Sequence, residues 1–571
     1  MKAMRLERIA AVAIVLGGCG SAMGPNASLL GADVASGGGG MSPDAGAEAL
    51  PCTTNAQCPS GLACQSSQCV SPADGLPPEQ QQPISGPPPA ATPHFVFALD
   101  PAGGQAVRVD AQTLAIESIP LGGNPAEIAA FTNADRVIVL NTGSDELHLL
   151  DATQPGPTAR TDIPLDRRQD HLRLAPDGSW AAAFTDPNNV PDQGAEGIVT
   201  VVRLAAPGSA PAGVPFDRAA GFRVSDVFFR TAGGVTKGAI AVALDSVSFI
   251  DLSNPKPPGL PPRQALPASA SADLASRAVV ATPDGAFVLV RSFTANDLTI
   301  IDVDSQTVST LALPDIATDL EIEPGGTAAI AVLRATAQVE LLRIPQDLRP
   351  SGAPQLLSLG GFNAGQIALS PVSGPMTGGP FGLLFTNASP TMEIARLDIA
   401  GGTVTPYPDA LQKLVQGAGI SPDGRSAVIV HRPDPNPATT DPYARQVALD
   451  QGYSMFDLAT AVAQLKRTGD VAVQGFAFAP AGGAAAVALR DDAAQQYGVD
   501  ILDLRTLVAT SLGLASPPEF VGAIPQASGA QAAPLVWVTQ VAPGGRISFV
   551  DLDSQSIQTV TGFELNSRIQ N

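Results

Sequence analysis

The chain has 571 residues and a formal net charge of -21, with 53 acidic and 32 basic side chains. Such an acidic surface repels phosphate backbones and anionic lipid head groups, which excludes nucleic-acid binding as the main activity and favours neutral or cationic partners. Glycine and proline, at 57 and 53 residues, are too frequent for a fold of long uninterrupted helices.

The chain begins with the pattern of an export signal. Lys2, Arg5 and Arg8 precede an apolar run over residues 9–16, and small residues follow up to Cys19. A charged start, a short apolar core and small residues before a cleavage point are typical of a secretory signal. A transmembrane anchor is the alternative, but residues 9–19 are too few, because a bilayer span needs about 20 residues.

The tetrapeptide Leu-Gly-Gly-Cys at 16–19 resembles the lipobox of bacterial lipoproteins. The resemblance implies that residues 1–18 are a signal peptide, that diacylglycerol is attached to the sulfur of Cys19, and that the new amino group is usually acylated. Two acyl chains suffice for lasting membrane attachment. Because residue 20 is Gly and not an Asp that would favour the inner membrane in enteric bacteria, we expect anchoring at the outer membrane, on its periplasmic side or at the cell surface.

A flexible tether and a small cysteine-rich module are expected next. Residues 19–50 are rich in Gly, Ala and Ser and show no apolar periodicity, as in a flexible tether. Residues 51–70 hold four cysteines, and an even number behind an export signal predicts two disulfides, with three possible pairings. A zinc site is the alternative, although no Cys-x-x-Cys pair occurs. The four residues are Cys52, Cys58, Cys64 and Cys69.

This cysteine spacing resembles short modules of the Dickkopf or epidermal-growth-factor-like type, which implies a spacer or contact role. Residues 71–93 then carry eight prolines. At ~3.1 Å per residue, a polyproline linker of this length reaches roughly 70 Å. The linker would hold the following domain away from the membrane.

Residues 94–571 contain a recurring unit of short apolar strands. Ten copies of the third strand are recognisable, most of them ending in Asp, at a spacing of about 48 residues, which is typical of repeat architectures. The predicted third strands are Val107–Asp110, Leu147–Asp151, Val199–Leu204, Val247–Asp251, Leu298–Asp302, Val339–Arg343, Glu393–Asp398, Tyr453–Asp457, Val499–Asp503 and Ile547–Asp551.

The turns between first and second strands have a shared chemistry. The sequences at 175–178, 282–285 and 421–424 all read x-Pro-Asp-Gly, in which Pro and Gly suit a tight turn. The strands beside them are short continuous apolar runs, typical of strands covered on both faces. The predicted class is therefore all-β, with sheets packed against each other.

These units resemble the YVTN-type repeats of bacterial β-propellers, which implies a propeller of four-stranded blades with about seven to ten units. A ring of ten exceeds the usual range of 4–8 blades, so elaborated units, two smaller rings or one unusually wide ring are all open. The first unit begins at its apparent second strand, near His94. We expect the C-terminal tail at 566–570 to supply the missing inner strand and so close the ring.

Catalytic motifs are scarce. His171 begins an inner strand and could face the central funnel, although an ordinary structural histidine is the simpler interpretation. No Cys-x-x-Cys-His, Gly-x-Ser-x-Gly, phosphate loop or His-Glu-x-x-His is present. The repeated Asp residues at the ends of third strands each start a turn, where a short carboxylate accepts backbone N–H groups, so we interpret them as structural.

Acidic side chains gather in the loops between second and third strands, which in propellers share one face with the blade-to-blade connections. We call these residues the acidic loop surface. It is a candidate binding surface for a cationic protein patch or for divalent cations, with solvated loops as the alternative. Its members are Asp186, Asp192, Glu196, Asp297, Asp434, Asp441, Asp491 and Asp492, together with Asp145 and Glu146.

The sequence therefore predicts an envelope lipoprotein whose propeller is a non-catalytic binding platform for an envelope protein. No cofactor is expected apart from a possible divalent cation, and metal ligands are not identified. The alternative is a hydrolase similar to propeller lactonases, with a site in the central funnel, because YVTN-like rings resemble that class.

Overall fold

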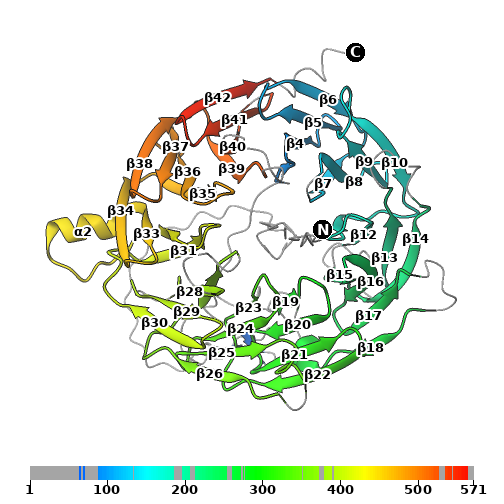
Figure 1. Cartoon of the computed structure of the whole chain (residues 1–571), viewed down its shortest axis with the longest axis horizontal. Helices are drawn as coiled ribbons and strands as arrows, with labels where there is room; N and C mark the ends of the chain where they lie inside the picture. Colours follow the sequence, from blue (N-terminus) through cyan, green and yellow to red (C-terminus); the bar gives the residue numbers. More distant parts are fainter. Residues whose placement is uncertain are drawn as a thin grey trace, which may run out of the picture.

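The computed structural model describes a ten-bladed β-propeller (Figure 1). The two-stranded hairpin of β1 (Ala63–Gln65) and β2 (Gln68–Val70) precedes it. The described residues are 63–65, 68–70, 88–132, 134–185, 196–205, 213–253, 260–271, 274, 277–349, 352–371, 379–388, 391–525, 534–542 and 544–562. The predictions for Cys19, Cys52 and Cys58 lie outside them, and the disulfides stay a prediction.

Each blade is a sheet of four consecutive antiparallel strands, the first innermost and the fourth outermost. Blades one to five comprise β3 (Ala90–Ala91), β4 (Phe95–Asp100), β5 (Gln105–Asp110) and β6 (Ile116–Pro120); β7 (Pro125–Ala130), β8 (Arg136–Asn141), β9 (Glu146–Asp151) and β10 (Ala159–Pro164); β11 (His171–Leu174), β12 (Trp180–Phe184), β13 (Glu196–Arg203) and β14 (Phe216–Phe222); β15 (Asp226–Ala232), β16 (Val235–Val242), β17 (Ser246–Asp251) and β18 (Arg263–Ala265); β19 (Arg277–Ala281), β20 (Phe287–Ser292), β21 (Asp297–Asp302) and β22 (Thr307–Ala312).

Blades six to ten comprise β23 (Asp319–Ile322), β24 (Ala328–Leu333), β25 (Gln338–Arg343) and β26 (Gln355–Ser358); β27 (Gln366–Leu369), β28 (Phe381–Phe385), β29 (Ile394–Asp398) and β30 (Thr403–Tyr407); β31 (Val415–Ile420), β32 (Ser426–His431), β33 (Gln451–Asp457) and β34 (Val462–Gly469); β35 (Ala472–Phe478), β36 (Ala484–Asp491), β37 (Gln496–Asp503) and β38 (Val508–Gly513); β39 (Pro518–Ala523), β40 (Leu535–Gln540), β41 (Arg546–Asp551) and β42 (Ser556–Thr561).

All ten predicted third strands are confirmed, and the unusually wide single ring is the correct alternative. The core is divided among the blade interfaces. Ten clusters of buried apolar side chains occur, one between each pair of neighbouring blades. Second strands such as β24 and β32 are buried at every position, which explains their continuous apolar sequence.

The ring closes differently from the prediction. The inner strand of blade one is β3, whose Ala90 and Ala91 pair with Phe97 and Val96 of β4. The predicted contribution of the C-terminal tail to this blade is therefore wrong, and the tail itself lies outside the described residues. Blades ten and one meet through apolar side chains, including Trp537 and Phe549 against Val96 and Val107. Among the described residues, blades ten and one share no strand, and burial of apolar surface joins these two sheets.

The x-Pro-Asp-Gly turns connect first to second strands as predicted, and they also contact the neighbouring blade. In blade three, the Asp177 carboxylate accepts hydrogen bonds from the N–H and hydroxyl of Thr236 in blade four at 2.8 and 2.7 Å. In blade five, Gly285 has φ +66°, and a Cβ there would collide with the backbone of Phe229 in blade four. The glycine is required by both the turn and the close approach.

Two helices lie in the connections. α1 (Ala268–Ser271) is a single turn between blades four and five, and α2 (Pro442–Leu449) lies in the long connection from β32 to β33, at the rim of the ring (Figure 1). Among the residues described, no helix has both the length and the apolar character needed to cross a bilayer.

Candidate functional site

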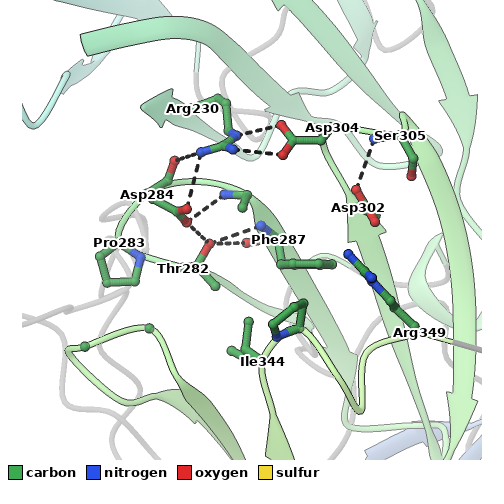
Figure 2. A pocket seen from close by; sticks show the side chains of 14 residues that line it. Arg230, Thr282, Pro283, Asp284, Phe287, Asp302, Asp304, Ser305, Ile344 and Arg349 are labelled. Carbon is green, nitrogen blue, oxygen red and sulfur yellow. Dashed lines mark hydrogen bonds and ion pairs between the residues drawn. The ribbon is translucent and has the colours of Figure 1, made fainter. Parts of the chain in front are cut away.

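A cavity of ≈ 740 Å³ opens where the turns of blades four, five and six converge (Figure 2). Its lining comes from the first-to-second and third-to-fourth strand connections, so it lies on the face opposite the acidic loop surface. A cavity of this size falls in the range of small-molecule sites.

One wall of the cavity is an enlarged turn. In blade five the connection between third and fourth strands covers residues 303–306, whereas in blade six residues 344–354 separate β25 from β26. Ile344, Pro345 and Arg349 of this longer connection line the cavity. Pro283 and the largely buried Phe287 of blade five complete its apolar lining. The cavity therefore depends on the longer connection of blade six, since the corresponding connection of blade five is a short turn.

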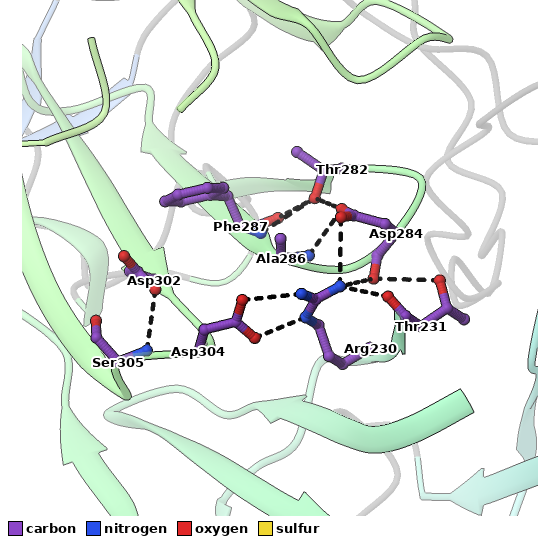
Figure 3. Close-up of polar contacts among 9 residues, drawn as sticks. All are labelled: Arg230, Thr231, Thr282, Asp284, Ala286, Phe287, Asp302, Asp304 and Ser305. Atoms are coloured by element: carbon purple, nitrogen blue, oxygen red, sulfur yellow. Dashed lines mark hydrogen bonds and ion pairs between the residues drawn. The ribbon is translucent and has the colours of Figure 1, made fainter. Parts of the chain in front are cut away.

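Arg230 organises the opposite edge of the cavity (Figure 3). It lies in β15 of blade four, and its Nε and Nη2 donate to the two carboxylate oxygens of Asp304 at 2.8 Å each. Its Nη1 also donates to the backbone and side-chain oxygens of Asp284 at 3.2 and 3.3 Å. The hydrogen bond from Arg230 lowers the pKa of Asp304. One guanidinium therefore bridges two carboxylates across the blade boundary, and the three groups together keep one net negative charge.

Two further charged side chains of the cavity are not paired in this way. Arg349 is exposed, and its guanidinium has no ion pair or hydrogen bond to the described residues. Asp302 accepts the N–H of Ser305 on Oδ1 at 3.1 Å, and its Oδ2 has no such partner. Figure 2 shows both residues at the same side of the cavity. The cavity thus offers one cationic and one anionic group to a ligand.

The predicted acidic loop surface is partly engaged in local structure. Asp186 and Asp192 lie outside the described residues. Two members form ion pairs, Glu196 with Arg263 and Asp492 with Arg490 at 2.8 Å. Asp297 accepts a hydrogen bond from the hydroxyl of Ser269 in α1 at 2.8 Å. Asp434 accepts the N–H of Asn436 at 3.0 Å, and Asp491 accepts the N–H groups of Ala493 and Ala494 at 2.9 Å. Glu196 and Asp492 are therefore paired with arginines, whereas Asp297, Asp434 and Asp491 accept hydrogen bonds from neutral donors.

Asp441 has a defined role as the N-cap of α2, where its carboxylate accepts the N–H of Ala444 at 2.7 Å. At the other end of the helix, the buried Lys413 donates to the carbonyls of Val447 and Ala448 at 2.5 and 3.1 Å. An ammonium at a helix C-terminus satisfies carbonyls that lack helical partners. Burial lowers the pKa of Lys413 to about 8.

The remaining surface of α2 is open. Tyr443 is 69% exposed, and the guanidinium of Arg467 lies 5.7 Å from its ring centroid. Arg467 is held in turn by Asp450 at 2.6 Å. The connection between β32 and β33 therefore presents an aromatic side chain on a helix that is fixed at both ends.

The predicted funnel residue His171 starts β11 and is part of a charged group on the inner strands. Its Nδ1 lies 3.7 Å from Glu127 of blade two, and Glu127 also lies 3.5 Å from Arg173. Arg173 donates to Asp226 of blade four at 2.9 Å. The alternating charges of this group connect the inner strands β7, β11 and β15 of three blades, and we interpret the group as structural.

A second group of charged side chains lies in blades five and six, with Arg291 in the second strand β20 and Asp319 and Glu321 in the inner strand β23. Burial, with the nearby Asp319 adding to it and Arg291 opposing it, raises the pKa of Glu321 to about 8. Arg291 donates to the carbonyl of Ala317 at 3.2 Å. Asp319 accepts the N–H of Ile367 in blade seven at 2.9 Å. In the described part of the chain, no group of three or more His, Cys, Asp or Glu side chains is placed to hold a metal ion.

Four residues of these sites were not predicted from the sequence: Arg230, Asp304, Arg349 and Lys413. The sequence contains a signal for the connection that carries Arg349. In the sixth unit, more residues separate the third strand from the next apolar run than in the neighbouring units. Arg230 and Asp304 have no local signal, since 74 residues separate them.

No family model and no curated protein matches the chain. Solved structures with similarity include a eukaryotic initiation factor (11% identity, TM-score 0.43, 82% of this chain and 99% of that one). Others are dihydro-heme d1 dehydrogenase NirN in complex with DHE (13%, 0.39, 78% and 77%) and the Cps50 (Swd1) β-propeller domain of Myceliophteria thermophila (12%, 0.33, 75% and 98%). Similarity at this level says nothing about what this chain binds.

Proposed function

We propose that the protein is an outer-membrane lipoprotein, anchored through Cys19, whose propeller is a non-catalytic binding platform for an envelope protein. The lipobox-like sequence at 16–19, the proline-rich residues 71–93 and the YVTN-like repeats support this proposal. A tether of this kind keeps the ring attached to the membrane but holds it away from the bilayer, so that its faces stay accessible.

The observation that carries the platform proposal is the fixed helix α2 with its exposed aromatic residue. Tyr443 has the amphipathic ring that is enriched in protein interfaces, and the same connection from β32 to β33 carries Asp434 and Asp441. An exposed aromatic residue in a connection that also carries carboxylates favours a basic protein surface as the partner. Lys413 and Asp441 hold the helix in place, which lowers the entropy cost of binding.

Site-specific photocrosslinking in the native envelope tests this proposal. A photoreactive residue at position 443 is expected to capture a discrete basic protein, with yield falling as salt increases. Val235 is the matched control, because it is also exposed but lies in the hairpin on the opposite face of the ring. Equal capture from both positions, or none from position 443, would refute the proposed contact surface.

The anchor requires a separate test. Cys19→Ala is expected to remove the lipid and move the protein from the membrane fraction to the soluble fraction, without a change in the folding of the ring. Retention of the variant in outer-membrane vesicles would contradict lipid anchoring. Rapid hydrolysis of lactones by the purified protein would instead support the lactonase-like alternative.

A further inference from the structure

The cavity between blades four and six has a charge pattern that selects a ligand class. It contains Arg230 and Arg349 together with Asp284, Asp302 and Asp304. Arg230 donates four hydrogen bonds to the oxygens of Asp304 and Asp284 at 2.8 to 3.3 Å, and one to the carbonyl of Thr231. Both carboxylate oxygens of Asp304 and both of Asp284 accept hydrogen bonds. Among the described residues of the cavity, this leaves the guanidinium of Arg349 and the Oδ2 of Asp302 as the charged groups available to a ligand.

We propose that this cavity binds a short peptide with free ends, whose carboxylate pairs with Arg349 and whose ammonium pairs with Asp302. Arginine suits a carboxylate because its planar donors match both carboxylate oxygens. Asp302 retains a free Oδ2 for an ammonium, since its Oδ1 already accepts the N–H of Ser305. A ligand with only one charge would leave the other group desolvated and unpaired.

The volume and the apolar lining agree with a peptide. At ≈ 740 Å³ the cavity is larger than a single amino acid requires. Ile344, Pro345 and Pro283 line it beside the charged groups, so a ligand with an apolar side chain gains contact area. The enlarged blade-six connection supplies both Arg349 and two of these apolar residues, so one departure from the repeat creates the charge and the wall together.

This site lies on the face opposite α2, so the inference does not rest on the proposed function. Crosslinking from position 443 and peptide binding at the cavity can succeed or fail separately.

Calorimetric titration of the full-length, detergent-solubilised protein tests the inference with three probes. These are the dipeptide alanyl-leucine, its N-acetyl derivative, which lacks the ammonium, and its C-terminal amide, which lacks the carboxylate. The free dipeptide is expected to bind about tenfold or more tightly than either derivative, because each derivative loses one charge-assisted contact.

Variants assign each contact. Arg349→Gln is expected to make the dipeptide and its amide bind about equally, and Asp302→Asn to do the same for the dipeptide and its acetylated form. Asp302→Asn keeps an oxygen for the N–H of Ser305, so the turn is retained. Matched controls are Arg505→Gln and Asp551→Asn. Arg505 lies in a third-to-fourth strand turn on the same face, and Asp551 ends the third strand of blade ten and caps the following turn in the same way as Asp302.

The inference is overturned by several results. Equal binding of all three probes, or no binding up to millimolar concentration, would exclude a site for zwitterionic peptides. Tighter binding of the amide would indicate a cation site, and tighter binding of the acetylated form an anion site. Loss of discrimination in the control variants would show that the two named residues are not the recognition groups.

Discussion

Arg230 and Asp304 form a two-point ion pair across the boundary between blades four and five, with both N···O distances at 2.8 Å. The two residues lie 74 positions apart in the chain, and the curvature of the ring brings them together at the edge of the cavity. Because Asp304 is 66% exposed, the pair fixes the position of the turn more than it stabilises the fold.

A double-mutant cycle tests this interpretation. Combining Arg230→Gln with Asp304→Asn should give a coupling energy of about 1 kcal/mol or less, since exposed ion pairs are screened by water and salt. The coupling, measured by urea unfolding, should shrink at high ionic strength. Coupling above about 2 kcal/mol, or coupling that salt does not change, would show that the pair is a stabilising contact of the interior.

Removal of the buried ammonium at α2 should release that helix. Lys413→Met leaves the carbonyls of Val447 and Ala448 without their donor, at a cost of about 1–3 kcal/mol for unsatisfied buried groups. Amide hydrogen exchange should therefore accelerate over residues 432–450. The hairpin of β36 and β37 is the internal control and should be unaffected; unchanged exchange in α2 would contradict the assigned role of Lys413.

Acid stability should depend on His431. Its Nδ1 donates to the carbonyl of Leu414 at 3.2 Å, and its Nε2 accepts from the hydroxyl of Ser454 at 2.7 Å, so the His431 imidazole is neutral in the folded protein. Burial lowers the pKa of His431 to about 4, below its ordinary value of 6.5. Between these two values the unfolded chain binds a proton that the folded chain does not, so the wild type loses stability as the pH falls from about 6.5 to 4.

The variant His431→Gln should lack this loss, because glutamine can still donate to Leu414 and accept from Ser454 without titrating. Between pH 7 and pH 4, the free energy of unfolding should fall by about 3 kcal/mol more in the wild type than in the variant. Denaturant unfolding at both pH values measures it. His94→Gln is the control at an exposed histidine, and equal losses in wild type and His431→Gln would refute the neutral buried state.

Glu321 should produce the opposite pH dependence. Burial raises its pKa to about 8, so between 4.5 and 8 the folded chain holds a proton that the unfolded chain releases. This contribution to stability is present below pH 4.5 and is lost as the pH rises to 8. Glu321→Gln should therefore raise the unfolding temperature more at pH 9 than at pH 5. Glu393→Gln is the control, and a pH-independent gain would contradict this assignment.

Much of the fold could be predicted because its units are local. Each blade consists of four consecutive strands, so strand pairing and the Pro-Asp-Gly turns depend on residues close together in the sequence. The repeated Asp residues were interpreted correctly for the same reason. For example, Asp110 accepts the N–H groups of Gln112 and Thr113, only two and three positions away.

The closure of the ring could not be predicted in the same way. The unit beginning near His94 lacks a recognisable first strand, because β3 has only two residues and both are alanine. A strand this short carries no periodic signal. Closure depends on side chains such as Trp537 and Val107, which meet only when all ten sheets are stacked.

The all-β repeat, the ten third strands, the turn chemistry and the acidic character of the chain could be predicted from the amino-acid sequence, because each follows from neighbouring residues or from composition. That the ten units form one ring, that Arg230 meets Asp304, and that Arg349 and Asp302 share a cavity is established by the folded chain. Contacts of this second kind join different blades, and their geometry is fixed by the packing of whole sheets and not by any local pattern.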